Sequence, residues 1–467
     1  MPASRLPSPA SPSPTLAIVG GGLAGLSAAV AAIQRGWRVT LFERSKMLGG
    51  RASSFLDSTL NCLVDYSQHV AMGCCSSFLD FCRRTGIEDC FQRQRRLHFI
   101  APDGSQHDFA SSRILPAPLH LLPALMRLKF LSLADRLRIL PAMRKLTAQG
   151  FAQRDEALVT WLHRHHQSSP SVDRFWSTVV VSALGETVEN ASTAAAAKVF
   201  RDGFLASRHA ADLLLPSEPL GEIFHGRVGV WLEHRGVKVE LQNPISRIET
   251  QQQRGYLLTV SKTDIRPYDA AIVAVPWHEA GCLFSDELRA QMPFFDDAEK
   301  LAPAAITAVH FWFDRPAIPL AHAALIDRLS QWVFTQKCLF SETSKAAEKV
   351  PVFTQHCQVV ISAAHRLPQF SHVELLAKIR GELESIWPAV RDARLLHSRL
   401  LTQPKALFSV QPDSDCLRPR QQTPLPRLAL AGDWTSTGWP ATMEGAIRSG
   451  RLAVESLQND PESPRLA

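Results

Sequence analysis

The feature that most constrains how this chain folds is a glycine-rich turn close to its N-terminus. A short apolar run at 16–19 predicts a buried parallel strand, and the small residues at 24–33 predict a helix. Between the two, Gly20, Gly22 and Gly25 follow the pattern G-x-G-x-x-G. A strand, a glycine turn and a helix in this order form the first part of a dinucleotide-binding unit, whose helix N-terminus offers free N–H groups to phosphate.

A second strand is expected at 38–42, directly before Glu43. Glu43 comes 18 residues after the third glycine, the spacing at which an acid accepts hydrogen bonds from a ribose. The first glycine permits a tight turn, the second lets a pyrophosphate approach the backbone, and the third lets the helix pack closely on the sheet. The residues predicted to bind the dinucleotide here are Gly20, Gly22, Leu23, Ala24, Gly25, Glu43 and Arg44.

Length and composition limit the class of protein. A chain of 467 residues, 45% hydrophobic and 20% charged, suits a soluble globular protein of two intimately built domains. It contains no run of 18 uncharged apolar residues, so a transmembrane helix is not expected. Residues 1–14 are rich in proline and serine and predict a disordered tail. Nine scattered cysteines without a CxxC pair indicate reduced thiols in the cytoplasm and no metal site.

The net charge of +7 leaves several partners open. No nucleic-acid-binding motif accompanies it, so a mildly basic enzyme or one that contacts an anionic membrane surface is expected. The segment 119–146 mixes leucines with basic residues, and Pro123 and Pro141 are expected to break it into pieces. It suits either a helix lying in a membrane interface or a core-facing helical pair with a solvated basic face. The histidine-rich stretch 163–167 is interpreted as a solvated helix end.

The far end of the chain supplies a second set of candidate residues. A strand is expected at 428–430, ending before Gly432 and Asp433, and a helix is expected to start near Thr442 and Met443. Asp433 could bind hydroxyls of a cofactor chain, and the N–H groups of the helix start would face an electron-rich ring edge. Both ends of the sequence are therefore predicted to bind one ligand.

Further blocks carry a family resemblance. The element at 49–51, with Gly50 and Arg51, resembles the "GGR" of the flavin amine oxidase and phytoene desaturase superfamily. Residues 63–70, LVDYSQHV, and 428–453, with GWPATMEGA, are similar to the hydroxysqualene dehydroxylases, also called squalene-associated FAD-dependent desaturases. Tyr66-Ser67 stand where that family commonly has Asn-Gly, and a serine adopts positive φ poorly.

The resemblance implies FAD as the cofactor and an α/β fold: a Rossmann-like FAD-binding domain with an inserted mixed α+β substrate domain. It implies that Gly50 and Arg51 approach the flavin diphosphate, and that Ile245, in a strand pair at 234–249, presents its backbone to adenine. An apolar strand ending at 275–276 would return the chain to the same domain. The FAD-binding parts are expected at 15–90, 216–280 and 421–460, and the substrate parts at 91–215 and 281–420.

The implied activity is the reductive dehydroxylation of hydroxysqualene to squalene in hopanoid or triterpenoid biosynthesis. The leaving hydroxyl needs a proton, and hydride from reduced flavin N5 must meet an allylic cation kept away from water. Asp65, Gln68 and His69 are the catalytic candidates, with His69 as proton donor or water-positioner and Gln68 orienting it. The alternative is that these three residues brace the flavin domain.

Partners and other activities follow from the same resemblance. The expected partners are a polyisoprenoid alcohol, a membrane surface on the cytoplasmic side and neighbouring enzymes of the squalene pathway, but no nucleic acid. A phytoene or carotenoid-type desaturase and an amine oxidase remain alternatives, the latter needing an aromatic cage from a chain with three tyrosines. A flavin-containing isoprenoid carrier is the alternative without catalysis.

Overall fold

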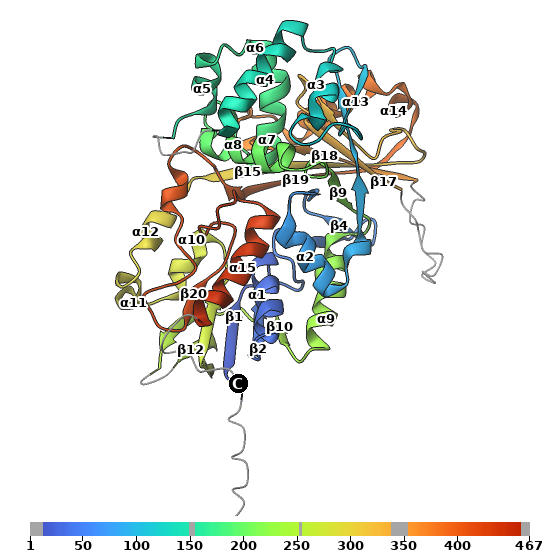
Figure 1. Ribbon diagram of the computed structural model, residues 1–467. Coiled ribbons are helices and arrows are strands. Elements are labelled where there is room, and N and C mark those ends of the chain that lie inside the picture. Colours follow the sequence, from blue (N-terminus) through green and yellow to red (C-terminus); the bar gives the residue numbers. More distant parts are fainter. Residues whose placement is uncertain (1–12, 149–154, 252–254, 338–353, 459–467) are drawn as a thin grey trace, which may run out of the picture.

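The computed structural model describes residues 13–148, 155–251, 255–337 and 354–458. The tail predicted at 1–14 lies outside the described residues apart from its last two positions. Two regions are stacked on each other in Figure 1: a parallel sheet with helices on its faces, and above it a larger sheet covered by a layer of helices. Within the described residues, no helix is long and apolar enough to span a bilayer.

The lower region is built on a five-stranded parallel sheet in the order β10-β2-β1-β14-β20. Its strands are largely apolar runs because helices and loops cover both faces. All three stretches expected to bind the nucleotide contribute to it, and the predicted α/β class is confirmed. Its strands are β1 (Thr15–Val19), β2 (Arg38–Glu43), β10 (Lys238–Leu241), β14 (Ala270–Val273) and β20 (Leu428–Leu430).

The first and last helices of the chain lie side by side on this sheet (Figure 1). They are α1 (Leu23–Ile33) and α15 (Met443–Gln458). Gly450 lies at their contact, where an added Cβ would come within 2.2 Å of the Ala24 carbonyl oxygen. Only glycine permits this approach, so the two ends of the sequence are locked together at backbone distance.

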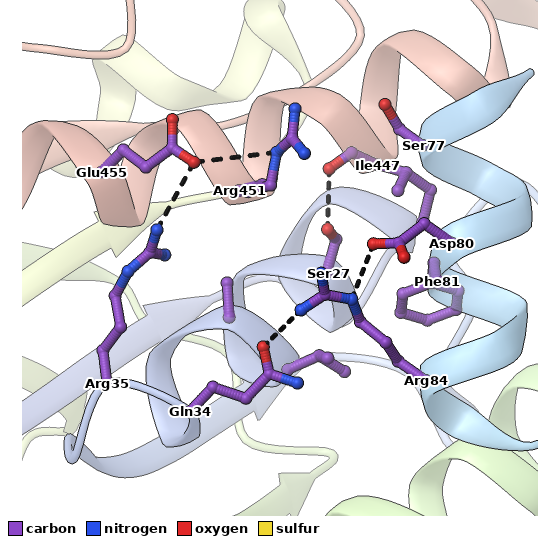
Figure 2. A pocket seen from close by; sticks show the side chains of 12 residues that line it. Ser27, Gln34, Arg35, Ser77, Asp80, Phe81, Arg84, Ile447, Arg451 and Glu455 are labelled. Atoms are coloured by element: carbon purple, nitrogen blue, oxygen red, sulfur yellow. Dashed lines mark hydrogen bonds and ion pairs between the residues drawn. The ribbon is translucent and has the colours of Figure 1, made fainter.

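An outer groove between α1, α15 and α2 (Ser76–Thr85) has a volume of ≈ 380 Å³ (Figure 2). Its polar groups bind one another. The Ser27 hydroxyl donates to the Ile447 carbonyl at 2.7 Å, and Arg84 donates to Asp80 and Gln34 at 2.6 Å each. The hydrogen bonds across the groove therefore connect the three helices.

The upper region is built on a seven-stranded sheet in the order β19-β15-β18-β17-β16-β7-β8, antiparallel except for the β16–β7 pair. Two segments far apart in the sequence join at that parallel pair. The strands are β7 (Arg96–Ile100), β8 (Gln106–Ala110), β15 (Pro303–Phe313), β16 (His322–Leu325), β17 (Trp332–Lys337), β18 (Gln355–Ile361) and β19 (Leu395–Phe408).

Helices from the middle of the chain cover one face of this sheet (Figure 1). The layer comprises α3 (Leu122–Met126), α4 (Leu133–Ala148), α5 (Leu158–Arg164), α6 (Ser169–Ser171), α7 (Thr178–Leu184) and α8 (Thr193–Phe200). α8 continues into η4 (Arg201–Leu205), a π-helical turn. The other α-helices of the described residues include α9 (Val230–Glu233), α10 (Trp277–Ala280), α11 (Asp286–Ala290), α12 (Phe294–Ala298), α13 (His372–Ile386) and α14 (Pro388–Asp392).

Three small sheets complete the architecture. They are β3 (Ser54–Asp57) with β4 (Cys62–Asp65); β5 (Ala71–Met72) and β6 (Phe91–Gln94) with β9 (Leu213–Pro216); and β11 (Arg247–Thr250) and β13 (Asp264–Tyr268) with β12 (Tyr256–Ser261). The strand pair expected at 234–249 is wrong as a pair. β10 joins β2 in the parallel sheet, whereas β11 pairs with β12. Gln242, with φ of +55°, and Pro244 turn the chain between them.

The break expected at Pro141 is also wrong, because α4 runs through this residue. Pro141 is exposed, while Ile139, Ala142 and Leu146 on the opposite face are buried. Burial of that apolar face holds the helix together despite the lost hydrogen bond. The segment is interrupted between α3 and α4 instead. At 163–167 the two exposed histidines fit a solvated helix end, but Gln167 is buried and accepts from the Trp176 indole at 3.0 Å.

Candidate active site

One cavity of ≈ 1170 Å³ lies between the two regions and is lined by both. Nearly every residue predicted to bind a dinucleotide lines it; Gly25 alone of that set lies beneath the turn. The two ends of the chain therefore contribute to one site. The predicted residues that line it are Gly20, Gly22, Leu23, Ala24, Glu43, Arg44, Gly50, Arg51, Ile245, Gly432, Asp433, Thr442 and Met443.

The glycine turn leaves a cradle that side chains would fill. A Cβ on Gly25 would lie 1.9 Å from the Gly20 carbonyl oxygen, so α1 starts directly against the turn. A Cβ on Gly50, whose φ is +62°, would lie 3.0 Å from the Gly22 Cα. The Gly49 N–H donates to the Gly21 carbonyl at 2.8 Å. Two glycine loops thus pack together at the start of α1 and fit a diphosphate held by backbone N–H groups.

Glu43 lies at the end of β2 with its carboxylate beside the turn. Its Oε2 accepts from the Gly21 N–H at 2.7 Å, and its Oε1 accepts from the Ser45 N–H at 2.8 Å. Each oxygen keeps a further lone pair for a ribose hydroxyl. The Asn243 N–H donates to the Glu43 carbonyl at 3.1 Å, which brings the loop that carries Ile245 to the same end of the cavity.

Arg51 and Asp433 join the two ends of the sequence inside the cavity. An Arg51 Nη lies 2.5 Å from Asp433 Oδ1, and the other donates to the Ala406 carbonyl at 2.7 Å. Asp433 is buried while Arg51 is partly exposed. The pair fixes the loop after β20 against the second glycine loop.

The start of α15 faces the same cavity. The Thr442 hydroxyl accepts from the Gly445 N–H at 3.2 Å, so Thr442 caps the helix. The N–H groups of the first helical turn have no partner within the helix and suit the electron-rich edge of a flavin.

Glu444, which the sequence analysis missed, connects the start of α15 to the start of α2. Its buried carboxylate accepts from the Ser77 N–H at 2.9 Å and the Phe78 N–H at 2.8 Å, which caps α2. From the sequence alone, Glu444 is explained by its position in the first turn of a helix, where an acid interacts favourably with the helix dipole. Its partner helix starts more than 360 residues earlier, so no local signal indicates the contact.

Gln68 and His69 both line the cavity. The His69 Nδ1 donates to the Ser67 carbonyl at 2.9 Å, because a carbonyl can only accept. Burial lowers the pKa of His69 and the Arg51 charge lowers it further. Together they outweigh the hydrogen bond to Ser67, which by itself would raise the pKa. A neutral His69 bonded in this way presents Nε2 as an acceptor. This departs from the expectation that His69 holds a proton near neutral pH.

Asp65 is not among the residues that line the cavity. Its Oδ1 accepts from the Ser54 hydroxyl at 2.5 Å and from the Leu220 N–H at 2.9 Å. Burial raises the pKa of Asp65 to about 6. These contacts brace the β3–β4 hairpin. The neighbouring Ser67 does not have positive φ, so the serine is not strained by the turn.

The substrate end of the cavity has mainly apolar walls. They include Leu97, Phe99, Val179, Phe204 and Phe334. Lys198, on α8, is the one charged side chain that the described residues of the upper region add to the lining. The sequence analysis missed it, although a single lysine after four alanines in an apolar helix was an available signal. In the described part of the chain, no group of three His, Cys, Asp or Glu is placed to hold a metal ion.

Comparison with known proteins agrees with this geometry. The family model for flavin containing amine oxidoreductases matches residues 23–457. Hydroxysqualene dehydroxylase of Zymomonas mobilis is 26% identical over 94% of this chain and 97% of its own length. The chloroplastic/chromoplastic 15-cis-phytoene desaturase of Narcissus pseudonarcissus is 25% identical over 95% of this chain and 79% of its own length.

Solved structures show the same fold. The crystal structure of an oxidoreductase from Methanosarcina mazei superposes with a TM-score of 0.67 at 16% identity, covering 96% of this chain and 100% of that one. The resemblance inferred from the sequence blocks is confirmed, and FAD is the cofactor that the glycine cradle fits. The chain is an FAD-dependent oxidoreductase and belongs to the flavin-containing amine oxidoreductase family.

Proposed function

We propose that the protein reduces hydroxysqualene, a C30 allylic alcohol, to squalene. One observation carries the proposal: the cavity that holds the nucleotide loops continues into a chamber with largely apolar walls. Such walls suit a long isoprenoid chain and keep water from a reactive carbon. A relative named hydroxysqualene dehydroxylase, aligned over nearly the full length of both chains, supports the choice of substrate.

The overall change is that the alcohol gains a hydride and a proton and releases water. When bound, reduced FAD supplies the hydride to the carbon that bore the hydroxyl. The residues of the chain orient the alcohol and supply the proton. We propose that His69 Nε2 accepts the hydrogen of the substrate hydroxyl and that Gln68 orients this contact, because both side chains line the cavity. We assign Asp65 to bracing the hairpin.

Dehydrogenation of a polyene is the second candidate. It is favoured by the relative named 15-cis-phytoene desaturase, which aligns over almost as much of the chain. The two activities share an apolar chamber but run the flavin in opposite directions. An amine oxidase is less well supported, because a charged amine would meet mainly apolar walls.

Anaerobic mixing separates these activities. Protein reduced with dithionite is mixed with hydroxysqualene, and oxidised protein is mixed with phytoene or with a primary amine. We expect flavin reoxidation with squalene formed in the first mixture and no flavin reduction in the others. A flavin that stays reduced beside bound hydroxysqualene would overturn the proposal and favour a carrier.

We further propose that a face around α3 and α4 rests on an anionic membrane surface. Eight large hydrophobic side chains are strongly exposed among the described residues, and four of them lie in this one segment: Ile114, Leu119, Leu133 and Leu137. Leu133, Leu137 and Pro141 share the outer face of α4 at intervals of four residues. We call Leu133, Leu137 and Pro141, with the exposed basic residues of α4 described next, the α4 face.

The charges on the α4 face have one sign. Arg138, Arg144 and Lys145 are exposed beside its leucines. Asp135 is buried and accepts from the Ser132 and Ser168 hydroxyls at 2.6 Å each, so it does not offset them. Exposed leucines flanked by cations suit anionic headgroups over an acyl boundary.

The α4 face also lies behind the cavity. α4 packs on α8, whose Lys198 and Val199 line the chamber, and the Phe130 ring lies 6.3 Å from that of Phe99 in the chamber wall. A protein resting on lipid through this face would hold the chamber close to the phase in which an apolar substrate dissolves. A protein held there would also lie beside neighbouring enzymes of the squalene pathway, which are proposed partners.

A further inference from the structure

We infer that Lys198 is the proton donor to the leaving hydroxyl and that Asp202 is the residue that holds it in place. This inference rests on the proposed dehydroxylation and adds to it a group that the reaction needs, because hydroxide is a poor leaving group and water is a good one.

Lys198 lines the cavity beside the loop that precedes α15. It lies in the last turn of α8, and its partly buried side chain lines the cavity. Its Nζ lies 4.5 Å from the centroid of the Trp439 ring. Trp439 also lines the cavity and comes three residues before Thr442, the cap of α15. The ammonium therefore lies beside the loop that leads into the flavin-facing helix.

Asp202 fixes this ammonium. Its Oδ2 lies 2.5 Å from Lys198 Nζ, and its Oδ1 accepts from Arg201 Nε at 3.0 Å. Burial alone would raise the pKa of Asp202, but the hydrogen bonds and charges of these two cations outweigh it and lower the pKa. The carboxylate thus stays ionised and accepts a hydrogen bond from the lysine side chain. An ammonium has three N–H donors, and Asp202 takes one of them.

Three other ionisable groups that line the cavity already have partners or offer an acceptor. Both oxygens of Glu444 accept backbone N–H groups, and Asp433 is paired with Arg51. His69 in its neutral form offers an acceptor to the alcohol. Among the described residues of the upper region, Lys198 is the lining group that brings a cationic N–H donor to the apolar walls.

The step balances as follows. The Lys198 N–H bond breaks as its proton passes to the substrate oxygen, the C–O bond breaks, and water leaves. The carbon gains a hydride from reduced FAD, the reductant that the proposed function supplies. The positive charge moves from nitrogen to carbon during the step, and we expect the Trp439 ring, which lies beside Lys198 Nζ, to stabilise it. Lys198 is left as a neutral amine and regains its proton from solvent.

Two substitutions separate proton transfer from charge. Lys198→Met removes both, while Lys198→Arg keeps a cation for Asp202 and Trp439 that does not release its proton. Lys300→Met is the control, because Lys300, in the turn after α12, forms a similar pair with Asp297 at 2.7 Å outside the cavity. Each FAD-loaded variant is reduced anaerobically and mixed with hydroxysqualene, and flavin reoxidation is followed in a single turnover.

We expect both Lys198 variants to bind FAD and to reoxidise about 10²- to 10⁴-fold more slowly than wild type, the usual contribution of a general acid. Lys300→Met should match wild type. In a third variant, Lys198→Ala, added ethylammonium should restore part of the rate of flavin reoxidation. If Lys198→Arg reoxidises its flavin at a rate within threefold of wild type, Lys198 does not donate the proton. Wild-type protein that fails to reoxidise would instead overturn the dehydroxylation itself.

Discussion

The two ends of the cavity are built in different ways. At the nucleotide end much of the wall is backbone, from the glycine loops around Gly22 and Gly50 and the first N–H groups of α1 and α15, with few side chains such as Glu43. At the substrate end they come from side chains such as Phe99 on β7 and Phe334 on β17, which belong to distant parts of the chain. Added side chains would clash with backbone at the first end, whereas side chains themselves form the walls of the second.

The largest effect is expected at the nucleotide end, from Gly25→Ala. The added Cβ would lie 1.9 Å from the Gly20 carbonyl oxygen, so the turn and α1 must separate. We expect the purified protein to lose bound FAD, measured by the flavin absorbance per chain. Gly381→Ala is the control, because this helical glycine has no atom within 4 Å of an added Cβ. Retention of FAD by Gly25→Ala would show that the cradle is not as described.

The β3–β4 hairpin beside the cavity offers a pH test. Burial raises the pKa of Asp65 to about 6. The folded state therefore binds this proton more tightly than the unfolded chain, and the stability it contributes is lost as the pH rises from about 4 to about 6. Asn keeps the Oδ1 that both partners of Asp65 use. Asp65→Asn should therefore be more stable than wild type at pH 8, by at most about 3 kcal/mol, but not at pH 4.

Asp57, on the paired strand, should behave in the opposite way. Burial would raise the pKa of Asp57, but the Leu60 and Thr59 N–H groups, with His397 and Arg399, lower it. Its stabilising effect is therefore present at neutral pH and lost in acid. Urea unfolding of Asp57→Asn and Asp65→Asn at both pH values checks these signs. The same pH trend for both variants would contradict the assignment.

A smaller loss is expected where the two ends meet, at Glu444. Glu444→Gln replaces one acceptor of the α2 cap by an NH₂ group, leaving a buried N–H without a partner. The free energy of unfolding should fall by about 2 kcal/mol, measured by urea unfolding. Glu374→Gln is the control, since that acid caps α13 at an exposed site. Equal effects of the two substitutions would argue against a buried cap.

The smallest effect concerns the α4 face behind the substrate end. Leu133→Ser combined with Leu137→Ser should weaken binding to vesicles of phosphatidylglycerol about tenfold, because less apolar surface enters the lipid. Co-sedimentation measures it, and Val373→Ser, at an exposed valine on α13, is the control. Equal binding of wild type and the double variant, or equal binding to phosphatidylcholine, would remove the membrane from the account.

The contrast between the two ends also explains what the sequence could predict. The βαβ unit at the start, the strand at 428–430 and the cofactor residues around them follow from local spacing, and the structure brings nearly all of them to one cavity. The lysine after four alanines marks Lys198 in the sequence, but its position over Trp439 depends on tertiary packing that no local pattern encodes. Glu444 caps a helix from the other end of the chain. Pro141 was misjudged because packing of the buried face of α4 outweighs a helix breaker.

The central claim is that substrate carbon and flavin meet in the cavity shared by both regions. The most direct test is a single turnover in D₂O, with the enzyme reduced there by dithionite so that flavin N5 carries deuterium, followed by mass spectrometry of the product. We predict squalene with one deuterium at the former carbinol carbon and one oxidised flavin per chain. Squalene without that deuterium, or a flavin that stays reduced, would contradict the account.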